Sequence, residues 1–417
     1  ASQHWAVIMA GSNTYSNYRH QADTFHAVKI MLENGIARDH IIHLAYDDIA
    51  NSRYNPFPGE LYNVPSSGPG VNVYDADNVD YTGADVTKEN FFKVLTGDSS
   101  ASGPVLGSDT SSKVFVYFAD HGAPGLICTP AGRSSEWIHA DELQDTFKTM
   151  QANGMYKELT FYVEACESGS MFPDLTADQN IYAMTASNAT QSSYGAYCGS
   201  QARVNGKNIG SCLADLFSIN WMTDTESNDP FSETLKTQYE NVKRTTNMSP
   251  VQEFGDLSIQ DELVAAFETD GSQYSAKHLM KKVDHFRKAV TAKLTAEADA
   301  EEPISVDSRD MDLHFAVEQH KLQGTEETAA AVEKELAHRY SVDAVFEKVI
   351  APEENIALVG EVSDFDCYRT LLAAYEDMCG PWTSYALKYA KYLSTACATM
   401  TPDQISERVF GTFATVC

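Results

Sequence analysis

The sequence predicts an α/β domain, built on a mostly parallel sheet flanked by helices, followed by an all-helical C-terminal region. Over residues 1–270, short runs of apolar, aromatic and β-branched residues alternate with helical patterns, which is typical of strands joined by crossover helices. Two of these runs stop abruptly at a reactive side chain, one at His121 and the other at Cys166. Beyond residue 270 the apolar spacing becomes helical. These observations favour a sheet domain with a separate helical domain.

The first element is a strand predicted at residues 4–11, followed by a helix at 20–34 with Gly35 as its C-terminal stop. The next strand is predicted at 41–46. Residues 51–85 are rich in Pro, Gly, Asn, Ser and Asp and are expected to form a long irregular connection. At least five strands alternating with helices therefore share one sheet. The remaining elements are helices at 86–95 and 140–150 and strands at 113–119, 159–165 and 181–186.

The composition changes near residue 270, where the polar stretch 270–273 forms a break. Residues 277–293 are expected to form a helix with one apolar and one basic face. A charged face is usually solvated, but this one can dock on the acidic domain that precedes it. The acidic stretch 297–310 is expected to be a linker, and helices with short turns to follow from Glu326. The predicted division is therefore a sheet domain at 1–270, an activation segment at 271–325 and a helical domain at 326–417.

The charge balance excludes one large class of partners. The chain has 417 residues, with 59 Asp and Glu against 30 Lys and Arg and a formal net charge of −29. Such a surface repels a phosphate backbone, so we expect no nucleic-acid partner. No apolar run reaches the roughly 18 to 20 residues of a membrane helix, so we expect a soluble protein with no membrane partner.

Eight cysteines fall into two groups. Cys367 and Cys379 lie in one helical pattern, where ~18 Å would separate them, too far for a disulfide. With Cys397 and Cys417, this leaves two crossed pairings open. Disulfides on this scale favour a secretory, extracellular or lysosome-like location. A third disulfide can close the Gly-, Asn- and Ser-rich loop between Cys198 and Cys212, which leaves Cys128 and Cys166 free.

The ends of the strands at 113–119 and 159–165 carry the candidate catalytic pair. Because the carboxyl ends of parallel strands meet at one edge of a sheet, we expect His121 and Cys166 to lie side by side. A lone Cys is most often structural, but Glu, Ser and Gly residues crowd around Cys166 where a structural Cys would gain nothing. An imidazole can accept the proton of a thiol and later pass one to a leaving amine. The amide N–H groups of Gly122 and Cys166 can hold a developing oxyanion.

Seven stretches carry a more specific signal: Asn17–Asp23, Tyr46–Asp48, Asp80–Gly83, Asp120–Gly122, Glu164–Ser170, Ser192–Tyr194 and Ser218–Met222. Together they resemble the legumains, the asparaginyl endopeptidases among the caspase-like cysteine peptidases. The four late cysteines and their helices resemble the C-terminal prodomain of the same family. The resemblance therefore implies a caspase-like sheet domain and a death-domain-like helical prodomain, joined in the inactive precursor of a cysteine endopeptidase.

The resemblance also implies roles for individual residues. Cys166 would be the nucleophile, His121 the acid and base, and Asn17 the group that orients the imidazole. A guanidinium at one end of the pocket and a carboxylate at the other would satisfy both ends of an Asn carboxamide. An Asp substrate would be repelled unless it is protonated. The pocket residues would be Arg19, His20, Glu164, Ser192, Ser193 and Asp215.

Further properties of the whole molecule follow from the same resemblance. The family pairs Cys367 with Cys397 and Cys379 with Cys417. The substrates would be peptides and proteins containing Asn, the C-terminal prodomain would act as an intramolecular inhibitor, and no metal or other cofactor would be needed. Entry through the secretory pathway would lead to a lysosome, a vacuole or secretion.

One departure from the family concerns maturation. Legumains typically cut themselves after Asn or Asp between the two domains, whereas this chain has no Asn from Met248 to Glu354. The family's blocking Asn corresponds to the region of Gln323 and Gly324, so we expect Gln323 to occupy the pocket as a poorly cleaved mimic. Cleavage would then follow Asp residues at low pH or require another protease. Candidate sites are Asp299, Asp307, Asp310 and Asp312.

Three alternative functions remain open. A transamidase or peptide ligase of the same family would use the same Cys and His. A metal-dependent hydrolase would bind a divalent ion through Asp47, Asp48, Asp120 and His121. A binding protein would use the helical tail beside a vestigial cleft, which the intact Cys and His argue against.

Overall fold

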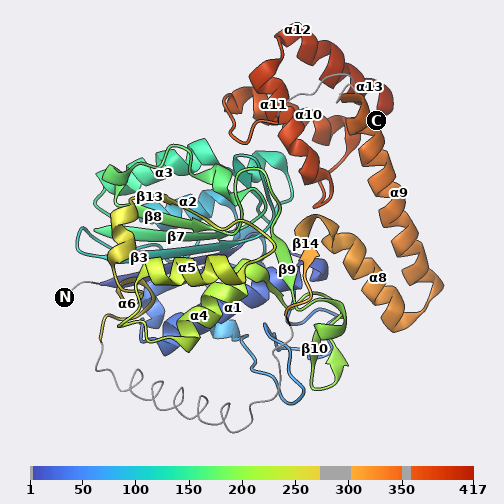
Figure 1. Cartoon of the computed structure of the whole chain (residues 1–417). Helices are drawn as coiled ribbons and strands as arrows, with labels where there is room; N and C mark the ends of the chain where they lie inside the picture. Colours follow the sequence, from blue (N-terminus) through green and yellow to red (C-terminus); the bar gives the residue numbers. More distant parts are fainter. Residues whose placement is uncertain (1–2, 273–301, 350–357) are drawn as a thin grey trace.

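The computed structural model describes residues 3–272, 302–349 and 358–417. Within them, a six-stranded sheet in the order β13-β8-β7-β3-β1-β2 forms the centre of the molecule (Figure 1). Neighbouring strands run parallel except for β13, which pairs antiparallel with β8 at one edge. The strands are β1 (His4–Ala10), β2 (Ile41–Leu44), β3 (Lys113–Ala119), β7 (Glu158–Glu164), β8 (Ile181–Thr185) and β13 (Gln252–Gly255).

Helices cover both faces of this sheet. On one face lie α1 (Tyr18–Glu33), α4 (Leu216–Ser227) and α5 (Leu235–Thr245), and on the other lie α2 (Lys88–Thr96) and α3 (Ala140–Ala152). Side chains alternate across a strand, so Val7 and Met9 of β1 join one core while Ala6 and Ile8 join the other. Strands buried on both faces are continuously apolar, which made these runs visible in the sequence.

The strands predicted at 4–11, 41–46, 113–119, 159–165 and 181–186 are confirmed as β1, β2, β3, β7 and β8. The expected helices at 20–34, 86–95 and 140–150 are α1, α2 and α3, with ends shifted by a few residues. The connection at 51–85 is irregular as expected, apart from isolated bridges and short 3-10 turns at 76–78 and 83–85. The edge strand β13 was not predicted. The α/β architecture is therefore confirmed, with one additional strand.

Three short sheets surround the carboxyl ends of the central strands. The first follows β3 directly, and the second includes β14, which comes from far downstream in the chain and pairs antiparallel with β9. Their strands are β4 (Gly122–Ala123), β5 (Leu126–Ile127) and β6 (Ile138–His139); β9 (Tyr194–Ala196), β12 (Ala214–Asp215) and β14 (Val306–Asp307); and β10 (Arg203–Val204) with β11 (Lys207–Asn208).

The short helix α6 (Ala265–Glu268) comes late in the sheet domain, and helices dominate the C-terminal region. Phe346, Tyr375, Trp382 and Phe413 pack ring against ring in the core of that region. The prediction of an all-helical region from Glu326 onward is confirmed. Its helices are α8 (Met311–Gln323), α9 (Glu326–Val349), α10 (Phe365–Cys379), α11 (Ala390–Thr399), α12 (Pro402–Gln404), a π-helix (Ile405–Phe410) and α13 (Gly411–Val416).

Three disulfides close the chain on itself: Cys198–Cys212, Cys367–Cys397 and Cys379–Cys417. Two of them therefore join α10 to α11 and to the C-terminal residue. Cys128 and Cys166 are free and buried. The basic segment expected at 277–293 lies outside the described residues. Within the described ranges, no helix is both long enough and apolar enough for a membrane span.

Candidate active site

His121 and Cys166 follow two neighbouring parallel strands. Ala119 at the end of β3 is paired with Glu164 at the end of β7, and each chain reaches its reactive residue two positions later. The amide of Asp120 donates to the carbonyl of Glu164 at 3.0 Å, which continues the pairing toward the site. A Cβ atom on Gly122 would lie 2.6 Å from the carbonyl oxygen of Cys166, so only glycine allows the two turns to pack this closely. The structure therefore brings the two turns together, as the sequence predicted.

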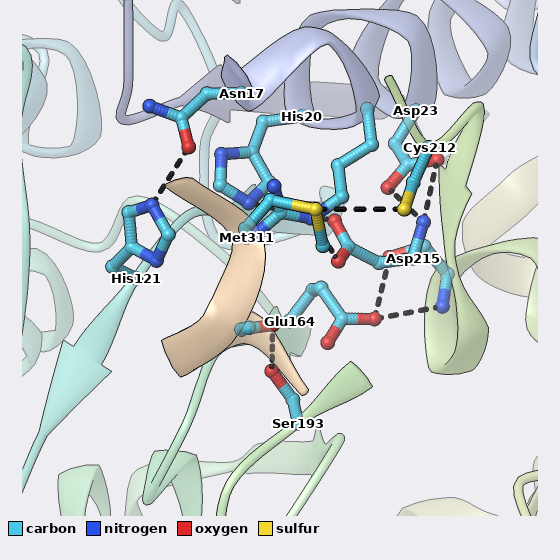
Figure 2. Close-up of polar contacts among 12 residues, drawn as sticks. Asn17, His20, Asp23, His121, Glu164, Ser193, Cys212, Asp215 and Met311 are labelled. Carbon is cyan, nitrogen blue, oxygen red and sulfur yellow. Dashed lines mark hydrogen bonds and ion pairs between the residues drawn. The ribbon is translucent and has the colours of Figure 1, made fainter. Parts of the chain in front are cut away.

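Asn17 determines which nitrogen of His121 is available. Its side-chain nitrogen donates to the carbonyl of Asn13 at 2.9 Å, which turns its oxygen, Oδ1, toward the imidazole (Figure 2). This oxygen lies 2.8 Å from Nε2 of His121 and can only accept, so Nε2 carries the proton. The other nitrogen, Nδ1, is buried and has no hydrogen-bond partner among the described residues. It is therefore the free base of the ring.

The thiol of Cys166 is fully buried in this state. Its sulfur receives the backbone N–H of Ser193 at 3.3 Å and lies 3.7 Å from the hydroxyl of the same residue. Burial raises the pKa of Cys166 to about 11, although the nearby Arg309 opposes the shift. Burial also lowers the pKa of His121 well below its ordinary value, and the charges of Arg19 and Arg309 add to this effect. Thiol and imidazole are therefore both neutral here.

The predicted specificity pocket is built around Arg19, which is fully buried. Its Nε donates to Asp215 at 2.7 Å, and the side chain of Asp215 is also buried. Glu164 accepts two hydrogen bonds from Ser218, one from the amide and one from the hydroxyl, both at 2.9 Å. Asp23, which was not predicted as a pocket residue, accepts the backbone N–H of Asp215 at 3.1 Å from behind (Figure 2). Three carboxyl groups thus lie close together, and one of them is paired with the guanidinium of Arg19.

Burial raises the pKa of Asp23, Glu164 and Asp215, and their mutual repulsion adds to this for Asp23 and Glu164. Arg19 opposes the shift for Asp215 and Glu164. Because one guanidinium cannot neutralise three carboxylates, the cluster holds protons at a pH where exposed carboxyl groups are ionised.

Three polar atoms of the pocket have no hydrogen-bond partner within the described residues. They are Nη2 of Arg19, Oδ2 of Asp215 and Oε1 of Glu164, and all three are buried. The first can only donate and the other two can accept. A buried polar atom without a partner destabilises the protein, so such atoms indicate a missing ligand group. One donor and two acceptors match the oxygen and the NH₂ group of a carboxamide.

His20 lies between Asp215 and His121. Its Nδ1 is 2.6 Å from the hydroxyl of Ser12, its Nε2 is 3.5 Å from Asp215, and its ring packs edge-on against His121. Burial lowers its pKa well below the ordinary value. Asp120 is buried beside it, and burial raises the pKa of that carboxyl group to about 8. His20 is therefore neutral and helps to connect the two parts of the site.

The metal site considered from the sequence is not assembled. Among the described residues, His20, Asp120 and His121 form a group with ligand atoms close together, whereas Asp47 and Asp48 do not join it. Within that group Nδ1 of His20 already contacts Ser12, and Nε2 of His121 contacts Asn17. Only Oδ1 of Asp120 and Nδ1 of His121 are left without a partner among the described residues, and two donor atoms are fewer than a divalent ion normally takes from a protein. The residues present therefore fit nucleophilic chemistry better than a divalent ion.

A downstream segment, residues 306–311, crosses the site; we call it the blocking segment. Its β14 pairs antiparallel with β9, and the amide of Ser308 donates to the carbonyl of Ser193 at 3.0 Å. Arg309 is buried and donates to the carbonyl of Gly122 at 2.6 Å and to Glu167 at 2.5 Å. The segment therefore contacts the backbone at Ser193, next to the thiol of Cys166, and at Gly122, next to His121.

Met311 fills space beside the specificity pocket. It is fully buried, and its sulfur lies 3.4 Å from that of Cys212. A Cβ atom on Gly195 would lie 2.6 Å from Cε of Met311 and 3.4 Å from Cδ of Arg19. Gly195 therefore lies next to both side chains, which places Met311 close to Arg19. Figure 2 shows Met311 next to His20 and Cys212.

The prediction that Gln323 occupies the pocket is wrong. Gln323 is exposed at the end of α8, where its side chain donates to Gln319 at 2.9 Å. Gly324 is also exposed and ends this helix in the left-handed conformation that glycine favours. The helix α8 begins only at Met311, so the residues that reach the site are those before the helix. The sequence comparison therefore placed the blocking residue at the C-terminal end of α8, whereas the residues that reach the site precede this helix.

The helical domain holds the blocking segment and covers the rim of the site. Arg339 of α9 donates to Asp310 at 2.6 Å and to the carbonyl of Arg309 at 3.3 Å. Glu376 of α10 accepts from the amide and hydroxyl of Ser134 at 3.0 and 2.7 Å. Next to this contact, Trp137 packs against Trp382. Polar and apolar contacts thus join the two domains.

Comparisons with known proteins agree with this architecture. The peptidase C13 family model matches residues 4–282. The chain belongs to this family. The legumain prodomain model matches residues 326–417, the region of α9 to α13. The chain is therefore a legumain-type cysteine endopeptidase in zymogen form, carrying its C-terminal prodomain.

Two peptidase C13 relatives illustrate the extent of the similarity. The vacuolar-processing enzyme beta-isozyme of Arabidopsis thaliana is 37% identical over 421 residues, covering 94% of this chain and 82% of the relative. The legumain of Mus musculus is 35% identical over 412 residues, covering 95% and 88%. A caspase-1 structure from Spodoptera frugiperda aligns with a TM-score of 0.36 at 8% identity, covering 61% of this chain and 86% of that chain.

Sequence reasoning missed several residues of this legumain site. Arg309 and Met311 lie far downstream, and the sequence signal at 307–312 was interpreted only as possible cleavage sites. Asp23 belongs to a noted motif but received no role. Glu167 was noted only for its charge beside Cys166. Ser192 is half-buried next to Ser193. Arg309, which lies between Asp307 and Asp310 within the predicted linker, was the available signal for the blocking segment.

Proposed function

We propose that the activated enzyme cleaves peptide bonds after Asn, and after Asp only at acidic pH. The observation that carries this proposal is the set of three unpartnered pocket atoms, on Arg19, Glu164 and Asp215. An Asn side chain would accept from the guanidinium and donate to the free oxygens of Glu164 and Asp215. A side chain without these groups would leave buried charges unpaired, which is costly.

In this proposal Cys166 is the nucleophile and His121 the acid and base. The imidazole accepts the thiol proton at Nδ1, because Asn17 keeps the proton on Nε2. The thiolate attacks the carbonyl carbon, and the protonated ring then returns the proton to the leaving amine. The amides of Gly122 and Cys166 would stabilise the oxyanion, which the close packing of these two turns supports.

Substrate would bind as an added strand on β9. The blocking segment supports this mode, since β14 already pairs with Tyr194 and Gly195. Backbone hydrogen bonds to a strand edge hold a peptide of any sequence, while pockets select side chains. The peptide and the blocking segment would compete for the same backbone groups.

The pH dependence follows from the pocket carboxyl groups. An ionised Asp side chain would meet Asp215 and Glu164, so it should enter only when protons are available. We expect cleavage after Asn at about pH 6 and additional cleavage after Asp at about pH 4. A lysosome, a vacuole or an acidified secreted environment would suit this behaviour.

The test uses full-length protein activated by acid and peptides that differ only at one position, carrying Asn, Asp or Leu. We expect kcat/KM for Leu to be lower than for Asn by at least about a hundredfold. Equal cleavage after Asp and Asn at neutral pH would contradict the pocket. Cys166→Ala should abolish activity, and iodoacetamide, rather than EDTA, should inactivate the enzyme.

A further inference from the structure

The loop between β1 and α1 contains a residue in an unusual backbone conformation. Thr14 has φ 68° and ψ 149°. This region is adopted almost only by glycine, and a β-branched side chain makes it less favourable still. Thr14 is exposed, so core packing does not force it into this conformation. Some specific contact must therefore hold it.

Asp48 provides that contact. One carboxylate oxygen, Oδ2, accepts the backbone N–H of Thr14 at 2.7 Å. The other, Oδ1, accepts from the side chain of Gln21 at 2.7 Å. Gln21 lies on α1 and is buried. Asp48 thus joins the loop to the helix that follows it, on either side of Asn17.

The position of Asn17 depends on this loop through two short hydrogen bonds. Its amide donates to the carbonyl of Thr14 at 3.0 Å, and its side-chain nitrogen donates to the carbonyl of Asn13 at 2.9 Å. The side chain of Asn13 in turn donates to the carbonyl of Pro130 at 3.2 Å. A change in the peptide units at 13 and 14 would therefore turn the oxygen of Asn17 away from His121.

We propose that Asp48 is a positioning residue for catalysis, which holds Thr14 in its left-handed conformation and so keeps the oxygen of Asn17 on His121. The inference rests on the proposed catalytic role of His121. Asp48 does not contact the thiol or the pocket atoms; it acts only through the loop. Its loss should misplace the imidazole while leaving substrate binding intact.

The first test is Asp48→Ala, assayed after acid activation of the full chain with an Asn peptide. We expect kcat to fall roughly 10- to 100-fold, with KM changed less than about threefold, because Arg19 and its partners are untouched. Concentrations of active enzyme are set by alkylation of Cys166, so a smaller folded fraction does not imitate a lower kcat.

Two further variants separate positioning from a merely structural role. Thr14→Gly removes the conformational penalty, so D48A combined with T14G should recover most of the lost kcat. Asp48→Asn should stay near wild type, since its oxygen can accept from Thr14 and its nitrogen can donate to Oε1 of Gln21, which is buried without a partner. The proposal would be overturned if neither the D48A/T14G double variant nor D48N kept a kcat close to that of the wild type. An unchanged kcat in D48A would also overturn it.

Asn17→Ala shows which statement has failed. If N17A loses kcat but D48A does not, the positioning role is wrong and the proposed catalytic role of Asn17 survives. If neither loses kcat, that catalytic role is wrong as well. Should D48A fail to fold, Gln21→Leu removes only one of the two anchors; it should lower kcat several-fold, and no change in kcat would count against the proposal.

Discussion

Arg309 makes contacts directly beside His121 and Cys166. It donates to the carbonyl of Gly122 and forms a buried ion pair with Glu167. Its backbone carbonyl is held in turn by Arg339. Because the partner charges are buried, removal of one side leaves the other unpaired, which is strongly destabilising for the contact.

We predict that Arg309→Ala gives the uncleaved zymogen measurable peptidase activity. Without the guanidinium, the blocking segment loses its bonds to Gly122 and Glu167, and a small peptide should compete for β9. The expected result is hydrolysis of an Asn peptide by uncleaved protein at about pH 6, at least tenfold above wild type. Lys321→Ala, an exposed change on α8, is the control. Equal background activity in both variants would contradict this role for Arg309.

At the residue scale, the sequence predicted groups that share a local motif and missed those that meet across the fold. His121 and Cys166 could be predicted because each ends an apolar strand. Arg19 and Asp215 needed the family resemblance, since 196 positions separate them. The prediction that Gln323 occupies the pocket was wrong, because a match to a family position does not show where the helix α8 begins. Asp23 reaches the pocket by accepting the backbone N–H of Asp215, a contact that no sequence pattern indicates.

At the element scale, β14 lies on β9 in the way that a bound peptide would. Ser308 is the residue whose amide bonds to Ser193, next to the thiol. Its hydroxyl lies 3.4 Å from that of Ser193, and Met311, which lies beside the pocket, is apolar. The blocking segment therefore has the backbone of a substrate without the side chain of one.

Ser308→Asn should convert this blocking segment into a substrate. The new carboxamide would stand beside Cys166 in a region that otherwise has no Asn from Met248 to Glu354. We expect slow autocleavage after residue 308 at about pH 6, detected by mass spectrometry of the fragments. Ser305→Asn, placed before β14, should remain intact. Cleavage in both variants, or in neither, would show that β14 does not sit in substrate register.

The helix pair α4 and α5 contains a second acidic cluster, away from the site. Asp224 and Glu233 both accept from the side chains of Asn228 and Asn241. One further oxygen of each carboxyl group is buried and has no hydrogen-bond partner among the residues that the structure describes. Burial and the charge of Asp224 raise the pKa of Glu233 to about 8. A proton held by the pair would supply the missing hydrogen bond.

Glu233→Gln should make the thermal stability of the zymogen less dependent on pH, so that its Tm falls less as pH rises. The folded-state pKa of Glu233 is raised, so its contribution is complete below the ordinary Glu pKa and is lost as pH rises through about 8. We expect the Tm of the wild-type zymogen to fall more steeply between pH 5 and about 9 than that of E233Q. Glu240→Gln, an exposed change on α5, should behave like wild type.

Element prediction succeeded where burial on both faces made the sequence apolar. The strands β1, β3 and β7 are examples. It failed for β13, whose residues are only half-buried and include a glycine, and for β14, which has two residues. Short edge strands take their conformation from the neighbour they pair with, so their own sequence carries little signal.

At the scale of the whole molecule, acidic side chains form many of the contacts between the two domains. Glu167 pairs with Arg309, Asp310 pairs with Arg339, and Glu376 accepts from Ser134. Arg369 of α10 also pairs with Asp141 of α3. Burial raises the pKa of Glu167, so this carboxyl group takes up a proton earlier than an exposed Glu on acidification. Low pH should therefore weaken the blocking contacts.

We predict that activity appears as pH is lowered and that the cuts follow Asp. The candidate positions within the described residues are Asp307, Asp310 and Asp312; Asp299 lies outside them. Sequencing the new C-terminus after incubation at about pH 4 identifies the site. Glu167→Gln should activate at a higher pH than wild type, because Arg309 then has no charged partner. An unchanged activation pH would assign the trigger to another carboxylate.

Two separate parts of the chain, the blocking segment and the helical domain, cover the site of this enzyme. Residues 306 and 307 pair with β9, while Glu376 of α10 and Trp382 beyond it contact the rim at Ser134 and Trp137. A cut in the α8–α9 turn would detach the cover and leave the inserted strand in place. Such an intermediate would have lost its helical domain but would still be inactive. The decrease in molecular mass and the appearance of activity therefore need not coincide during maturation.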